Sequence, residues 1–109
     1  MSYCIPAIIT DYFQAANGHD AAGAARCFDA DGTVRDEGKV YQGPAAIGQW
    51  AAASSAQYQA VIAPVAARGD GPRTEVDCQV SGSFPGSPVQ LQFRFTLAGA
   101  RIAALEITA

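Results

Sequence analysis

The sequence has few charged side chains and no segment rich in one sign of charge. Only 16% of its 109 residues are Asp, Glu, Lys or Arg, the formal net charge is −3, and the seven basic residues are scattered. A protein that follows nucleic-acid phosphates needs a basic patch, so we expect no nucleic-acid partner. The charge content also lies below the average for soluble domains, which indicates a large buried or self-associating surface.

Cysteine is scarce, and long apolar runs are missing. Cys4, Cys27 and Cys78 are odd in number and show no CxxC spacing, so a disulfide framework or a metal site is not expected. No apolar run approaches the ~20 residues of a membrane-spanning helix, and no basic-then-apolar signal pattern opens the chain. We therefore expect a cytoplasmic protein with no membrane partner, no metal and no organic cofactor.

What the sequence does have is enough apolar material for one core. Half of the residues are hydrophobic, and 109 residues lie within the common size range of one independently folding unit. Neither a linker, an internal repeat nor a low-complexity tract interrupts the chain. Residues 1–109 are therefore expected to form a single domain.

The first half of the chain has the periodicity of helices. Asn17-Gly18 predicts a left-handed stop to a first helix, Asp20 predicts the cap of a second helix over about residues 21–29, and Gly43-Pro44 predicts the start of a third. The apolar stripe of the first helix consists of Ile5, Ile8, Ile9, Tyr12, Phe13 and Ala16.

The second half alternates with period two, which is typical of strands. Asp29 to Gly32 predicts a turn before a short strand over 33–36, and Pro64 predicts an edge or a bulge. Gly99 predicts a turn into a last strand over 101–108. The inward positions of two further strands are Val76, Cys78 and Val80, and then Val89, Leu91, Phe93, Phe95 and Leu97. Helices followed by antiparallel strands predict an α+β fold, with three helices on one strongly curved, mostly antiparallel sheet.

Two polar residues fall on apolar elements and are the first candidates for a site. Tyr12 lies on the apolar stripe of the first helix, and alternation with inward Val34 points Asp36 inward as well. A hydroxyl and a carboxylate in one hydrophobic pocket can stabilise an enolate and move a proton. The alternative is structural: Asp36 is a residue of a strand-to-turn junction, Tyr12 a core aromatic, and His19 a solvated loop residue.

The whole chain resembles the nuclear transport factor 2-like superfamily, and within it the SnoaL-like and ketosteroid-isomerase-like branch. The resemblance rests on five motifs: Tyr12-Phe13, Gly18-His19-Asp20, Ala30 to Asp36, Gly43 to Ile47 with Trp50, and Gly99 to Ile102. It implies a cone-shaped, cystatin-like α+β roll and a homodimer formed through the sheet face. The same fold hosts isomerases, cyclases, dehydratases and noncatalytic modules, so it does not by itself assign an activity.

The resemblance gives the two candidate residues possible roles. Asp36 falls where ketosteroid isomerases keep their general base, and Tyr12 falls where they keep the phenol that donates to the enolate oxygen. Those enzymes also use a protonated acid on the penultimate strand; the corresponding position here is Phe93, or Gln92 if the turn is aligned without a gap. SnoaL-like cyclases use a carboxylate and a histidine, but the spacing of His19 does not suit a central pocket residue.

These observations lead to one functional hypothesis and one rival. The first is an isomerase, cyclase or dehydratase for a hydrophobic small molecule, with Asp36 and Tyr12 as its catalytic residues. The substrate-binding walls are expected to be Phe28, Trp50, Tyr58 and Phe93. The rival is a noncatalytic module of the same fold that binds a small ligand or serves for dimerisation.

Overall fold

The computed structural model describes residues 5–70 and 72–109, with the side chains of Tyr58 and Asp70 outside the description. The helices are α1 (Ala7–Asn17), α2 (Ala21–Arg26) and α3 (Gly43–Tyr58). The strands are β1 (Phe28–Asp36), β2 (Lys39–Gln42), β3 (Val61–Asp70), β4 (Arg73–Ser81), β5 (Val89–Ala98) and β6 (Arg101–Thr108).

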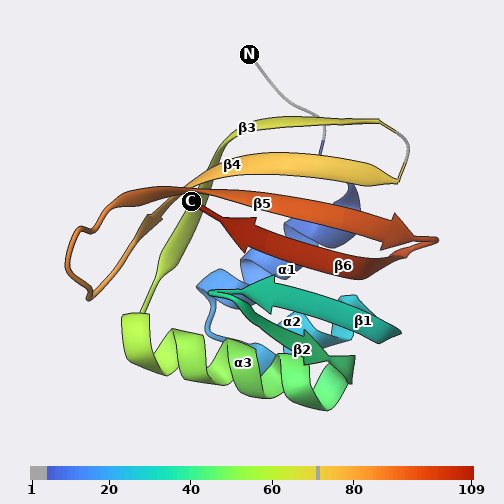
Figure 1. The fold of residues 1–109 in the computed structure, drawn as a ribbon, viewed down its shortest axis with the longest axis horizontal. Coiled ribbons are helices and arrows are strands. Elements are labelled where there is room, and N and C mark those ends of the chain that lie inside the picture. The colour runs from blue at the N-terminus through green and yellow to red at the C-terminus, as the bar shows by residue number, and fades with distance from the viewer. Residues whose placement is uncertain (1–4, 71) are drawn as a thin grey trace.

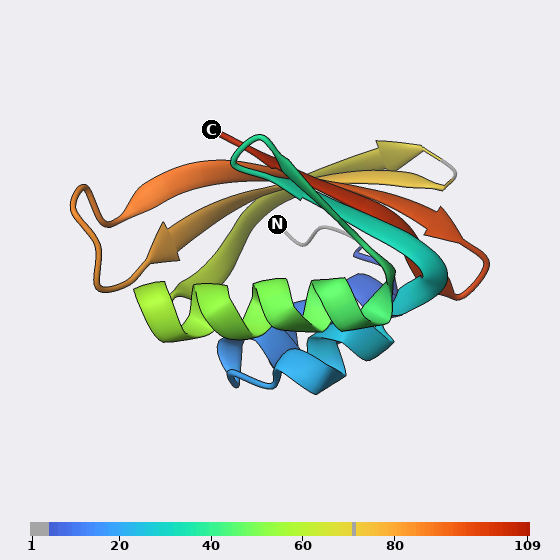
Figure 2. The same ribbon diagram turned by 60° about the horizontal axis from the view of Figure 1, so that its bottom comes forward.

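The six strands form one curved sheet that arches over the helices (Figures 1 and 2). Their order is β2-β1-β6-β5-β4-β3, and every neighbouring pair is antiparallel except β1 and β6, which are parallel. The helices lie on the concave face, where the hydrophobic core forms between them and the sheet (Figure 2). The predicted α+β class with a mostly antiparallel sheet is confirmed.

Helix α1 packs against the sheet through the face that the apolar spacing predicts. Ile9, Tyr12 and Phe13 are buried because residues three and four apart lie on one side of a helix. The helix ends at Asn17, but the predicted left-handed residue is wrong: Gly18 has a φ of −84°, and His19 takes the left-handed conformation with a φ of 57°.

Helix α2 and strand β1 meet earlier than expected. The Asp20 side chain caps α2 as predicted, since its Oδ1 accepts a hydrogen bond from the Gly23 N–H at 2.9 Å. The helix ends at Arg26, and the predicted turn at 29–32 is instead an irregularity inside β1. Gly32 permits it, because a Cβ at that position would lie 2.9 Å from the Asp29 carbonyl oxygen.

Helix α3 begins at Gly43 as predicted and continues past Ser55 to Tyr58. Gln59 ends it in the left-handed conformation, with a φ of 48°. Ile47 and Trp50 are buried on its inner side. Helix α3 lies below the sheet and covers part of its concave face (Figure 2).

Strands β3 to β5 confirm the alternation expected from the sequence. The inward residues Val76, Cys78 and Phe93 are buried, and the register between β3 and β4 shifts just after Pro64, where a bulge or edge was predicted. Val80 and Phe95 are buried too and belong to the same apolar inner face.

Of the three cysteines, Cys27 and Cys78 are free and buried, and Cys4 lies outside the described residues.

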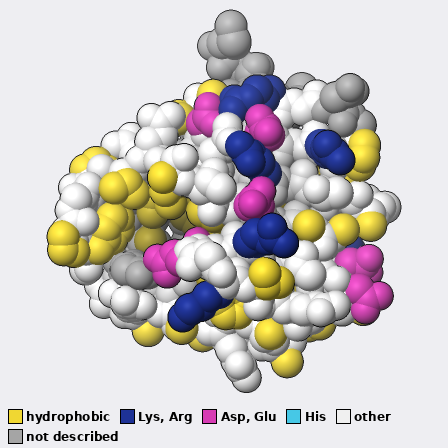
Figure 3. Space-filling model, in the orientation of Figure 1, with side chains coloured by type: hydrophobic (Ala, Val, Ile, Leu, Met, Phe, Trp, Pro, Cys, Tyr) yellow, Lys and Arg dark blue, Asp and Glu magenta, His cyan; other side chains and the backbone are white. Residues whose placement is uncertain are grey.

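A row of alternating charges crosses the convex face of the sheet (Figure 3). Arg68 bonds to Glu75 at 3.1 Å, and Arg94 lies 3.5 Å from Glu75 and 3.6 Å from Glu106. Strand pairing places Arg35 next to Glu106 in the same row. The members of this charge row, from β3 to β1, are Arg68, Glu75, Arg94, Glu106 and Arg35.

Candidate functional site

A cavity of about 370 Å³ lies between the concave face of the sheet and the three helices. Most of its lining is apolar; the sheet contributes Ile62, Val80, Leu91, Phe93 and Ile107. The cavity opens on the side where the surface is hollowed and framed by hydrophobic side chains (Figure 3). Its size and lining are those of a pocket for a small organic molecule.

Asp36 lies at the end of β1 and lines this cavity. Trp50 on α3 donates a hydrogen bond from Nε1 to Asp36 Oδ2 at 3.0 Å, which fixes the carboxylate against the helix. Partial burial raises the pKa of Asp36 above its usual value, the Glu37 carboxylate raises it further, and the Trp50 hydrogen bond opposes the rise. Asp36 is therefore a stronger proton acceptor than an exposed carboxylate.

Tyr12 reaches the same cavity from α1. Its ring is only 2% exposed and packs edgewise against Phe28 and Phe95, with centroid distances of 5.9 and 5.8 Å. Within the described part of the chain its hydroxyl makes no hydrogen bond, yet no buried polar side-chain atom there lacks a partner. The hydroxyl oxygen is therefore exposed at the cavity surface.

The Tyr12 phenol stays protonated. Burial raises its pKa far above the usual value, and the negative charge of Asp36 adds to the rise. Both side chains line the same cavity, so the phenol and the carboxylate belong to one site. The cavity thus holds a hydrogen-bond donor and a carboxylate in an apolar setting.

The remaining predicted wall residues fall in three different places. Trp50 and Phe93 line the cavity, and Phe93 is one of the two residues, with Gln92, that the resemblance sets against the third acid of the isomerases. Phe28, at the start of β1, lies outside the cavity lining and packs edgewise against the Tyr12 ring. The Tyr58 side chain lies outside the described residues.

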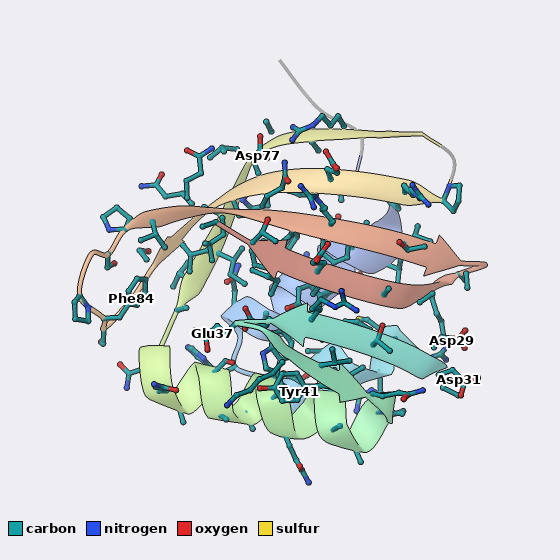
Figure 4. All side chains as sticks on the ribbon, viewed as in Figure 1. Asp29, Asp31, Glu37, Tyr41, Asp77 and Phe84 are labelled. Atoms are coloured by element: carbon teal, nitrogen blue, oxygen red, sulfur yellow. The ribbon has the colours of Figure 1, made fainter. Side chains whose placement is uncertain are left out.

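The cavity mouth contains residues that the sequence analysis did not assign to the site. His19 is exposed, as expected of a loop residue, but it also lines the cavity, and its Nδ1 forms a short hydrogen bond with the Ser55 Oγ of α3. Glu37 and Phe84 also line the cavity. They lie on opposite sides of its mouth, and Phe84 belongs to the β4–β5 hairpin (Figure 4). The Gly18-His19-Asp20 stretch of the family resemblance was the only sequence signal for this mouth.

The described lining contains acids but no Lys or Arg. The three carboxylates are Asp20, Asp36 and Glu37. Over residues 5–70 and 72–109, no group of three His, Cys, Asp or Glu side chains is arranged to hold a metal ion. Within the same ranges, no helix is both long and apolar enough to cross a membrane.

Several proteins of known structure share this fold. A Sinorhizobium meliloti protein named as a polyketide cyclase is 39% identical, with 95% of each chain covered and a TM-score of 0.92. A Catenulispora acidiphila protein with a ketosteroid isomerase-like fold, described in complex with trimethylamine, is 21% identical over 97% of this chain and 87% of its own, with a TM-score of 0.87.

A third similar structure is the epoxide hydrolase/cyclase-like enzyme SalBIII, which has a role in pyran ring formation in the polyether salinomycin. It is 21% identical, with 94% of this chain and 87% of its own covered and a TM-score of 0.76. No curated protein matches the chain. The SnoaL-like domain matches residues 9–105, which is nearly the whole sequence. The chain belongs to the SnoaL-like domain family.

Proposed function

We propose that the protein is a small-molecule enzyme of the isomerase, cyclase or dehydratase type. Asp36 is its general base and Tyr12 its oxyanion donor, while Trp50 and Phe93 form walls of the substrate pocket. Phe28 supports the Tyr12 ring from behind instead of contacting substrate. The single observation that carries the proposal is a partly buried Asp36 carboxylate that shares an apolar cavity with the Tyr12 hydroxyl.

The proposed step begins with a substrate carbonyl next to Tyr12. Asp36 takes a proton from the carbon beside the carbonyl, and the electron pair of that C–H bond forms the carbon–carbon double bond of an enolate. The charge moves to the oxygen, which accepts the Tyr12 hydrogen bond. Protonated Asp36 then returns the proton to another atom of the substrate, so that no external oxidant or reductant takes part.

The surroundings favour both halves of this step. A carboxylate that has lost hydration accepts a proton more readily, and a donor in a water-poor cavity stabilises developing charge more strongly than one in bulk water. The raised pKa of Asp36 has this direction, and the raised pKa of Tyr12 keeps its phenol protonated as a donor. Because Phe93 replaces a third acid, the oxyanion has one side-chain donor, and we expect no efficient steroid isomerisation.

Proton exchange tests the proposal without knowledge of the natural substrate. An apolar ketone such as 2-tetralone is incubated in D₂O with the protein, and loss of the protons beside its carbonyl is followed by ¹H NMR. We expect faster exchange than in buffer, and a fall to the buffer rate in Asp36→Asn. Asp31→Asn is the matched control, because Asp31 lies on the same strand at the end remote from Glu37 (Figure 4).

The rival function makes a different prediction in the same experiment. A noncatalytic module would bind the ketone, and the wild-type protein and Asp36→Asn would exchange its protons at equal rates. That outcome would overturn the enzymatic proposal and leave ligand binding as the role of the cavity.

We also propose that two copies of the chain associate through the convex sheet face. The charge row alternates in sign, so a two-fold axis between β4 and β5 would set four of its five residues opposite a residue of the other sign, with Arg35 outside the paired part. Glu75 would meet Arg94 of the second copy, and Arg68 would meet Glu106. This self-complementarity, together with the low overall charge, supports a homodimer.

A further inference from the structure

The charges around the cavity are unbalanced. Asp36 lies inside it, half-buried, while Asp20 and Glu37 are exposed at its mouth, and no Lys or Arg belongs to the described lining. Lys39 is the cross-strand partner of Asp36, but it is exposed and outside the lining. The cavity therefore presents negative potential to any ligand that enters.

A metal ion does not fit this charge distribution. Metal sites need several donor atoms at short range, and no suitable group of three occurs among the described residues. The Asp20 carboxylate is also occupied in part, because it accepts the Gly23 hydrogen bond at the start of α2. Carboxylates that lie apart from one another suit an organic cation, which is larger than a metal ion and needs no close set of ligands.

The walls add a second attraction for such a cation. Tyr12, Trp50, Phe84 and Phe93 all contribute aromatic rings to the cavity lining. The face of an aromatic ring attracts an ammonium group, most strongly where water is excluded. The rings also accommodate an apolar body, so one ligand can satisfy both the walls and the carboxylates.

An independent feature indicates that the cavity is built for a ligand with a polar atom. Tyr12 is only 2% exposed, yet its hydroxyl is accessible from the cavity and makes no hydrogen bond to the described part of the chain. A ligand oxygen inside the cavity can accept a hydrogen bond from this donor. The cavity therefore has a polar interior end in addition to its acidic mouth.

We propose that the cavity binds an organic cation, namely a small molecule with an apolar body and a protonated amine or quaternary ammonium group. The ammonium lies near Glu37 and Asp20 at the mouth, and the apolar body extends over the aromatic walls toward Tyr12. The inference names the substrate class of the proposed enzyme and rests on the proposed function in that respect. Binding itself requires no turnover.

Three ligands with one body and different head groups test the charge preference. They are 4-phenylbutylamine, 4-phenylbutan-1-ol and 4-phenylbutanoate, which are cationic, neutral and anionic at pH 7. Trp50 is the only tryptophan and lies in the cavity, so its fluorescence, excited at a wavelength where a phenyl ring does not absorb, reports binding. We expect the amine to bind about tenfold more tightly than the alcohol, with the carboxylate weakest, and the preference to shrink at high salt.

Charge variants locate the preference within the molecule. Glu37→Gln is expected to lower the amine-to-alcohol affinity ratio about threefold while leaving the alcohol affinity unchanged, as one exposed carboxylate has a modest effect. Asp31→Asn removes the same charge from an exposed position at the other end of β1 and should leave the ratio unchanged. Equal effects of the two variants would contradict a cation site at the mouth.

The results separate this inference from the proposed reaction. Tighter binding of the alcohol or the carboxylate, or no binding of any of the three ligands, would overturn the cation proposal even if ketone proton exchange depends on Asp36. Conversely, a strong amine preference without proton exchange would support the cation proposal and overturn the enzymatic one.

Discussion

Asn17 offers a stringent test of how the cavity wall is held in place. Its side-chain amide behaves like a short piece of strand beside Ile62 of β3: Nδ2 donates to the Ile62 carbonyl oxygen at 2.9 Å, and Oδ1 accepts from the Ile62 N–H at 2.7 Å. The two residues are 45 positions apart, and Ile62 lines the cavity. Asn17→Ala would therefore detach the end of α1 from the edge strand of the sheet.

The cost follows from the two hydrogen bonds. Each is worth about 1 kcal/mol net, and removal of the amide leaves two partly buried backbone groups of Ile62 without that partner, so we expect a loss of about 2 kcal/mol. Alanine has the better helix propensity, which returns up to about 0.5 kcal/mol. At about 4–8 °C per kcal/mol for a domain near this size, Tm should fall by about 10 °C.

Thermal and urea denaturation followed by circular dichroism measure this effect. Gln14→Ala is the matched control, because Gln14 is an exposed residue of the same helix and should change stability by less than about 0.5 kcal/mol. A loss in Asn17→Ala no greater than that of the control would refute the reasoning that these two bonds anchor β3.

Two further predictions concern the sheet face and the stability of the folded chain. Arg94→Glu places three acids together in the charge row, so sedimentation should detect a weaker dimer than the wild type forms; an unchanged dimer, or a wild-type monomer, would contradict association through this face. Because burial raises the pKa of Asp36 in the folded state, the folded protein holds its proton over a pH range in which the unfolded chain has lost it. The free energy of unfolding should therefore fall as pH rises from about 3.9, the ordinary Asp value, to the folded pKa, and Asp36→Asn should lack this fall.

The sequence predicted correctly those features that depend on residues close together in the chain. The spacing of Ile9, Tyr12 and Phe13 identified the buried face of α1, and Asp20 identified the start of α2, because a helix and its cap depend on neighbouring residues. Pro64 marked the irregular part of β3 for the same reason. The direction of Asp36 also followed from simple alternation with Val34.

Features that depend on distant contacts were not predicted in this way. The irregular stretch around Gly32 turned an expected turn into part of β1, and Phe28, where the strand begins, packs against Tyr12 outside the cavity lining. His19 lines the cavity together with Ser55, its hydrogen-bond partner 36 residues later on α3. Their contact depends on how α3 packs across α2, which no local pattern encodes.

The titration of the Asp36 carboxyl tests the central claim most directly. In protein labelled with ¹³C at aspartate carboxyl groups, the Asp36 signal is identified by its absence in Asp36→Asn, and its shift is followed against pH. The account predicts a midpoint above the ordinary Asp pKa of ~3.9, because the carboxylate lies in an apolar cavity beside Glu37. A midpoint at or below that value would contradict the assignment of Asp36 as the base of the site.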